Sequence, residues 1–276
     1  MVVQHNLTAM NSNRMLGVNT ATQAKSTEKL SSGYKINRAA DDAAGLAISE
    51  KMRRQVRGLT QAVANAQDGI SMVQTAEGAL NEVHDMLQRM NELAVKAANG
   101  TMTTVDRSYV NKEITALKSE INRVATTTTF NEQSLLAGSG TGAKAFVLQV
   151  GAEKTGSNTI TVSIGKMNAT GLGISATAST STITAAKNLI SDVKTAINNL
   201  NNQRADLGAQ QNRLEHTINN LNNVVENTTA AESQIRDTDM ATEMVKYSNN
   251  NILAQAGQAM LAQANQSNQG VLSLLG

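Results

Sequence analysis

Apolar residues recur every three or four positions through the second fifth of the chain. The series runs Ile48, Met52, Val56, Leu59, Val63, Ala66, Ile70, Val73, Ala76, Leu80, Val83, Leu87, Met90, Ala94 and Ala97. Its mean spacing is about 3.5 residues, the coiled-coil period, which predicts a long helix with a partner along its whole length. Asp41 or Asp42 is placed to cap the first turn. Asn99-Gly100 is the expected stop, in the left-handed conformation.

Two further helices are predicted to pack against this one. A shorter series contains Val110, Ile114, Leu117, Ile121 and Val124, and its short connection makes it an antiparallel neighbour of the first helix. A third series extends from Ile183 to Ile235, with Arg204 and Gln211 interrupting it. It is similar in length to the first, so the two are expected to form the two halves of one bundle.

The middle of the chain has a different pattern. Residues 131–182 are rich in Gly, Ser and Thr and contain two β-branched, alternating runs, "AFVLQVG" and "NTITVSIG", separated by "AEKTGS". These runs predict a β-hairpin, which we expect to cap the far end of the bundle. The fold class is therefore mainly α: a long antiparallel coiled-coil bundle of N- and C-terminal helices with a small β-hairpin region in the middle of the chain.

The pattern divides the chain into three regions. Residues 1–42 and 236–276 are terminal helices, residues 43–136 and 183–235 form a helical rod domain, and residues 137–182 form the hairpin or variable region. The terminal helices carry weak apolar series of their own. No charged residue follows Lys246.

The terminal helices are predicted to be assembly surfaces. Two such helices can pair, but a pair leaves apolar surface uncovered, and other copies of the chain could cover it. A heterologous contact that does not close into a ring builds a helical filament. The residues expected to make this contact are Val3, Leu7 and Met10 at one end, and Leu253, Ala256, Met260 and Ala264 at the other.

Composition narrows the choice of function. Aromatic residues make up only 2% of the chain, and proline and cysteine are absent, which suits long helices and excludes a disulfide framework. A net charge of +2 gives no reason to expect nucleic acid or an anionic membrane as partner. Residues 249–269 contain ten Asn or Gln amides, too many for a membrane-spanning helix. The N-terminus lacks the pattern of a signal peptide.

Candidate catalytic or metal-binding groups are few. The pair Asp41-Asp42 could suggest acid–base chemistry, but adjacent carboxylates at a helix start are more often caps. His5, His84 and His216 lie far apart with no metal-ligand spacing between them. Nothing resembles a phosphate loop or a nucleophile elbow. We expect no enzyme activity, no cofactor and no metal.

Two long stretches resemble a known family. They are "LTAMNSNRMLGVNTATQAKSTEKLSSGYKINRAADDAAGLAISEKMR" and "RADLGAQQNRLEHTINNLNNVVENTTAAESQIRDTDMATEMVKYSNNNILAQAGQAMLAQANQ", and they closely resemble bacterial flagellin. The resemblance covers essentially the whole chain except residues 137–182. It implies a short flagellin without large variable outer domains, a subunit of the extracellular flagellar filament that serves swimming. The terminal helices would form the inner tube of the filament and the rods its outer tube.

The resemblance also implies partners. Flagellins are exported unfolded through the flagellar type III apparatus, and an export chaperone typically holds the C-terminal helix, here about residues 236–276. Filament cap and hook-junction proteins are the other flagellar partners. Many flagellins are bound by Toll-like receptor 5. The matching residues are Arg89 and Leu93 in "LQRMNELAVKAAN" and Glu113 in "NKEITALKSEINRV".

Other interpretations remain beside these. The family often has Gln-Arg after "EIT", where this chain has Ala116 and Leu117, and Arg89 could instead be a solvated residue beside Met90. A hook–filament junction protein would share the terminal helices. A membrane-active or adhesive helical protein is a third possibility, although interfacial helices usually carry Lys or Arg on one face and Trp or Phe on the other. The likeness of the whole rod sequence to flagellin favours the filament subunit.

Overall fold

The described residues form five α-helices, two small hairpins and one short 3-10 helix. The computed structural model describes residues 6–138, 142–154, 156–175 and 179–272. The helices are α1 (Leu7–Ser32), α2 (Ala43–Ala97), α3 (Thr104–Thr127), α4 (Ile183–Arg236) and α5 (Met240–Leu272). Between α3 and α4 lie β1 (Thr129–Phe130), β2 (Gln133–Ser134), β3 (Lys144–Gln149), the short 3-10 helix η1 (Gly156–Asn158) and β4 (Thr159–Ile164). The mainly helical fold with a small central β region is confirmed.

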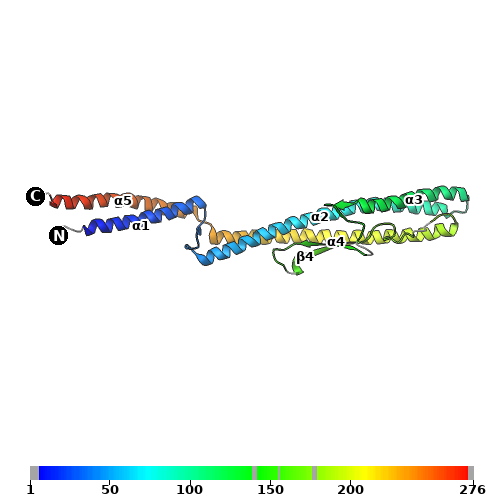
Figure 1. Cartoon of the computed structure of the whole chain (residues 1–276), viewed down its shortest axis with the longest axis horizontal. Helices are drawn as coiled ribbons and strands as arrows, with labels where there is room; N and C mark the ends of the chain where they lie inside the picture. The colour runs from blue at the N-terminus through cyan, green and yellow to red at the C-terminus, as the bar shows by residue number, and fades with distance from the viewer. Residues whose placement is uncertain (1–5, 139–141, 155, 176–178, 273–276) are drawn as a thin grey trace. The chain divides into compact units, whose positions relative to one another are not determined.

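The chain forms two compact units. Unit 1 consists of the residues up to Val56 and from Glu226 onward, and unit 2 of Arg57–Val225. The helices α2 and α4 each contribute to both units. In unit 1, α1 and α5 run side by side, with the beginning of α1 beside the end of α5 (Figure 1).

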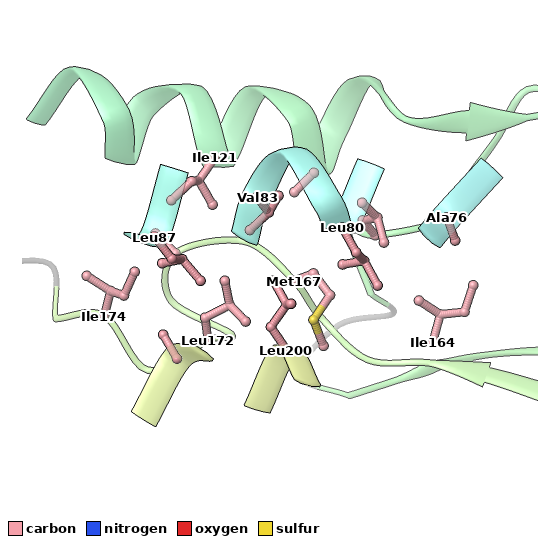
Figure 2. Packing of buried hydrophobic residues seen from close by; sticks show 14 of the residues in the cluster. Ala76, Leu80, Val83, Leu87, Ile121, Ile164, Met167, Leu172, Ile174 and Leu200 are labelled. Carbon is pink, nitrogen blue, oxygen red and sulfur yellow. The ribbon is translucent and has the colours of Figure 1, made fainter. Parts of the chain in front are cut away.

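Unit 2 contains the main apolar core, where α2, α3 and α4 meet the chain between α3 and α4. We call this stretch, residues 128–182, the middle segment. Leu80, Val83 and Leu87 of α2 are fully buried, as the apolar series predicts. Figure 2 shows these side chains between Ile121 of α3, Leu200 of α4 and the middle-segment residues Ile164, Met167, Leu172 and Ile174. The beginning of the series behaves differently. Ile48 is 47% exposed, so this first member of the predicted series does not lie on the packed face of α2.

The turn between α2 and α3 is held by a buried arginine. Arg107, which is 7% exposed, donates from Nε to the carbonyl of Ala97 and from Nη2 to that of Asn99, both at 3.0 Å. The last carbonyls of a helix lack partners within it, and a cation there also complements the helix dipole. The left-handed stop predicted at Asn99-Gly100 is wrong, because neither residue has a positive φ. At the other end of α2, Asp42 caps the helix as expected, accepting a hydrogen bond from the Gly45 amide at 2.9 Å.

The hairpin predicted in the middle of the chain is present. β3 and β4 are antiparallel, with Lys144 opposite Ile164 and Gln149 opposite Thr159. The hairpin does not cap the far end of the bundle, however. It lies against α2 near Gly69, where a Cβ atom would come within 2.3 Å of Leu148 Cδ1. A side chain at position 69 would push this leucine away, so glycine permits the close approach.

Amide side chains of the helices fasten the middle segment by its backbone. Asn65 Nδ2 donates to the carbonyl of Gln149 at 3.0 Å. Gln203 accepts from the Gly165 amide at 2.9 Å and donates to the Ser163 carbonyl at 3.1 Å. Later in the segment, Asn122 accepts from Ala169 N, Asn199 donates to Leu172 O and Asn111 accepts from Thr180 N. These hydrogen bonds provide partners for backbone groups of the middle segment that have none within its two-stranded sheets.

The Gln203 contact can be tested directly. Replacing Gln203 with alanine should lower the free energy of unfolding by about 1 kcal/mol, because it removes two backbone hydrogen bonds, of which the one from the Gly165 amide is part-buried. Hydrogen exchange at the Gly165 amide should accelerate at the same time. The matched control is Asn202→Ala, which trims an exposed amide one position away and should leave both unchanged. Equal behaviour of the two variants would contradict the role of Gln203.

Candidate assembly surface

Small residues are prominent in the interface between α1 and α5. The helices lie antiparallel: Asn6 Nδ2 donates to the carbonyl of Ala264 at 3.0 Å, and the Thr238 amide donates to the carbonyl of Gly33 at 2.9 Å. Ser26 and Ala254 are buried between the helices, and a Cβ on Gly257 would lie 3.3 Å from Leu16. Small residues let the two backbones approach closely, but they bury little apolar area.

Most large apolar side chains of both helices are exposed. At 3.6 residues per turn, Leu7 lies two and a half turns from Leu16, on the opposite face of α1. Val245 has the same nine-residue offset from Ala254 in α5. The apolar side chains of α1 and α5 that are 49–70% exposed form one set, which we call the outer apolar set: Leu7, Met10, Met15, Val18, Met240, Met244, Val245, Ile252, Leu253 and Met260.

The residues predicted for assembly fall into three groups. Leu7, Met10, Leu253, Ala256 and Met260 are exposed. Ala264 is 7% exposed and packs within the α1–α5 pair. Val3 lies outside the described residues. The prediction omitted six exposed residues, which show that each helix has apolar residues on two faces: Met15, Val18, Met240, Met244, Val245 and Ile252. A helical-wheel reading of both faces could have found them.

A buried carboxylate lies in the α1–α5 interface. Glu243 is 6% exposed and lies 3.4 Å from Lys246 Nζ. A hydrogen bond from the Ser26 side chain, with Lys246 and Lys29 nearby, lowers the pKa of Glu243. The pocket beside it has a volume of about 390 Å³ and is lined also by Lys25 and Asn249. The carboxylate is therefore held in its charged form between the two helices.

One arginine ties the ends of several helices together within unit 1. Arg236, the last residue of α4, stacks over the Tyr34 ring with its guanidinium carbon 4.6 Å from the ring centre. Its Nη1 donates to Glu50 of α2 at 2.7 Å, and this hydrogen bond lowers the pKa of Glu50. Its backbone carbonyl accepts from the Lys35 amide at 2.6 Å. The connection that follows α1 is thereby fixed to the end of α4.

The three residues that the family resemblance assigns to a receptor lie together at the α2–α3 end of unit 2. Arg89 Nε donates to Glu113 at 2.9 Å, and this contact raises the pKa of Arg89. Both side chains are about half exposed. Leu93 is only 3% exposed, so it supports this surface from beneath. A pocket of about 640 Å³ lies beside them, lined also by Met102 and Tyr109.

The described residues show neither a metal cluster nor a membrane span. In that part of the chain no three His, Asp or Glu side chains come together in a way that could hold a metal ion. None of its helices has a stretch long and apolar enough to cross a bilayer. His84 and His216 lie on α2 and α4, and His5 lies outside the described residues.

Comparison with known proteins identifies the family. Residues 3–141 match the model of the bacterial flagellin N-terminal helical region, and residues 190–275 match that of the C-terminal helical region. Flagellin of Halalkalibacterium halodurans is 51% identical over 276 residues, covering all of both chains. Flagellin of Bacillus subtilis is 48% identical over 305 residues, and the flagellar filament 31.3 kDa core protein of Treponema maltophilum is 47% identical over 296, again with full coverage.

A solved structure agrees with these matches. The crystal structure of Bacillus cereus flagellin has a TM-score of 0.50 and 33% sequence identity, and the match covers 57% of this chain and 88% of that one. Two family models span most of the chain, and full-length relatives share about half of its residues. The chain belongs to the bacterial flagellin family.

Proposed function

We propose that the chain is a structural subunit that polymerises into the flagellar filament, with other copies of itself covering the outer apolar set of α1 and α5. The observation that carries this proposal is the exposure of ten large apolar side chains on helices that pack together through small ones. Full burial of a Leu, Ile, Val or Met side chain stabilises by about 1.5–3 kcal/mol. Exposed large apolar side chains in this number on one helix pair favour an interaction site.

Copies of the same chain are the partner that fits this surface best. From Tyr247 to Leu272 the surface of α5 has no charged side chain, so identical helices can meet without like charges opposing each other. The outer apolar set lies on both α1 and α5, which allows one subunit to use different faces against different neighbours. Contacts of that heterologous kind build open helical polymers.

The three regions of the chain then have distinct places in the filament. The terminal regions, residues 1–42 and 236–276, form its inner core. The rod region, residues 43–136 with 183–235, forms the outer core, and residues 137–182 form the short variable region. The buried core of unit 2 supports this assignment, because it lets the rod fold without neighbours.

Export and capping partners belong to the same proposal. The subunit leaves the cell unfolded through the flagellar type III apparatus and acts outside the cell in the flagellum. An export chaperone holds α5 before assembly, and the exposed Val245, Ile252 and Leu253 give it an apolar face to bind. Filament cap and hook-junction proteins meet the same terminal helices. The identities above, taken over full-length flagellins, favour the filament subunit over a junction protein.

A second candidate function is recognition by Toll-like receptor 5 through the α2–α3 end of unit 2. The half-exposed Arg89–Glu113 pair supports it, because a fixed guanidinium beside a pocket is a suitable anchor for a protein partner. The buried Leu93 contributes by holding Arg89 in place.

Assembly through the outer apolar set can be tested by placing one charged side chain in that set. Ile252→Asp should leave the monomer folded, with its free energy of unfolding within about 0.5 kcal/mol of wild type, since Ile252 is 61% exposed. In seeded polymerisation it should raise the critical concentration about a hundredfold or more, because a carboxylate would be buried unpaired. Sedimentation and electron microscopy measure this.

The control for that experiment is Val147→Asp. Val147 is 65% exposed on β3 of unit 2, so the same kind of substitution falls outside the terminal helices. This variant should polymerise like wild type. Normal filaments from Ile252→Asp would overturn the proposed interface.

The buried Glu243 predicts a pH dependence. Because the pKa of Glu243 is lowered, this carboxylate stabilises the α1–α5 pair above the ordinary glutamate value of 4.5, and the contribution is lost as the pH falls through the pKa of the folded state. Helix content of the wild-type monomer, followed by circular dichroism, should therefore decrease on acidification below about pH 4.5. Glu243→Gln should be less stable by about 1 kcal/mol at pH 7 and change less on acidification. Glu226→Gln, which removes an exposed carboxylate of the same unit, should follow wild type. An unchanged profile for Glu243→Gln would argue against the role of this carboxylate.

Receptor recognition is tested at Arg89. Arg89→Ala should weaken binding of the monomer to the Toll-like receptor 5 ectodomain about tenfold to a hundredfold, measured by surface plasmon resonance. The matched control is Arg14→Ala, which removes an exposed arginine from α1 and should bind like wild type. Equal affinities for the two variants would rule out the Arg89 contact.

A further inference from the structure

The methionines are unequally exposed in the two units. Five of those in unit 1 are 49–63% exposed: Met10, Met15, Met240, Met244 and Met260. In unit 2 Met72, Met90 and Met167 are buried, and Met86 and Met102 are half-buried. Within the part of the chain that the structure describes, the exposed methionines therefore all belong to the outer apolar set, and they make up half of it.

We propose that these five methionines are oxidation sites through which peroxide or hypochlorous acid blocks incorporation of the free subunit into the polymer. This inference rests on the proposed function, because it requires that the outer apolar set be covered by other copies. It adds a chemical modification that acts on the subunit before assembly.

The reaction needs only an accessible thioether and an oxidant. The sulfur of an exposed methionine attacks one oxygen of hydrogen peroxide, an S–O bond forms and the O–O bond breaks. After proton transfer one water molecule leaves. Sulfur is oxidised by two electrons and peroxide is reduced by two. Exposure controls the rate, so the five unit 1 methionines react ahead of the buried Met72, Met90 and Met167.

The product no longer suits an apolar interface. A sulfoxide is polar and accepts hydrogen bonds, whereas the thioether is apolar and adapts its shape to its neighbours. Burying the sulfoxide oxygen without a donor is unfavourable. Around Met260, the stretch of α5 between Tyr247 and Leu272 offers no charged donor, and the amide donors there would have to leave water to meet the sulfoxide oxygen.

The modification leaves the rod intact. The core of unit 2 contains none of the exposed methionines, so an oxidised subunit keeps its folded bundle and loses only its assembly surface. The block is also reversible: methionine sulfoxide reductases remove the oxygen as water while two thiols are oxidised to a disulfide. In the polymer the same side chains are covered and react slowly.

The first experiment oxidises purified monomer with dilute hydrogen peroxide and maps sulfoxides by peptide mass spectrometry. Oxygen should be found at the five exposed methionines before Met72, Met90 or Met167. Circular dichroism should change little, and the seeded polymerised fraction should fall about tenfold or more, because sulfoxides are excluded from the interface. Treatment with methionine sulfoxide reductase and a thiol should restore it.

The matched variants are two sets of Met→Leu substitutions, which conserve volume and remove the sulfur. A fivefold variant at positions 10, 15, 240, 244 and 260 should still polymerise after peroxide treatment. Met86→Leu combined with Met102→Leu, in unit 2, should remain as sensitive as wild type. If the fivefold variant loses assembly on oxidation as wild type does, the inference is wrong.

A second measurement uses wild-type protein alone, in case leucine itself disturbs assembly. Partially oxidised monomer is polymerised, and the sulfoxide content at each of the five positions is compared between pelleted polymer and supernatant. The pellet should be depleted in all five. Equal sulfoxide in both fractions, or no preferential oxidation of these positions, would overturn the inference. Failure of untreated wild-type protein to polymerise would instead reject the proposed function itself.

Discussion

The helices at the two ends of the chain pack together mostly through small residues and leave ten large apolar side chains exposed. Ser26, Ala254, Gly257 and Ala264 bring α1 and α5 close together. That closeness turns the outer apolar set toward solvent. Most helical stability in proteins comes from packing an apolar face, so the α1–α5 pair by itself buries too little apolar area to be very stable. The need for further copies of the chain follows from this choice of interface residues.

Unit 2 buries its large apolar side chains within a single subunit. The helices α3 and α4 and the middle segment surround the apolar series of α2, and its large members, such as Leu80 and Leu87, are fully buried. The two units therefore differ in what completes them. Unit 2 is completed by its own chain, while unit 1 presents a surface that a copy can complete. A monomer that is stable enough to survive before assembly and still ready to polymerise needs both kinds of packing.

Periodicity predicted the elements that repeat the same contact at every turn. The series from Leu59 to Ala97 is such a case, and the alternating β3 and β4 are another. It could not tell which of two apolar faces meets the partner helix, so Ala264 was assigned outward and Ile252 was missed. Amide contacts were beyond prediction for a different reason. Gln203 fastens the hairpin and Asn202 is exposed, yet no feature of the local sequence distinguishes them.

The way the middle segment is fastened has a consequence for chain length. Asn65 holds the end of β3 at Gln149, and Gln203 holds the chain just after β4 at Gly165. Both attachments lie outside the connection between the strands, so residues added within that connection would leave them unchanged. The entropy of closing a loop rises only slowly with its length. The helices thus form a fixed frame, and the tip of the hairpin is a position where the subunit can acquire a new outer surface at little thermodynamic expense.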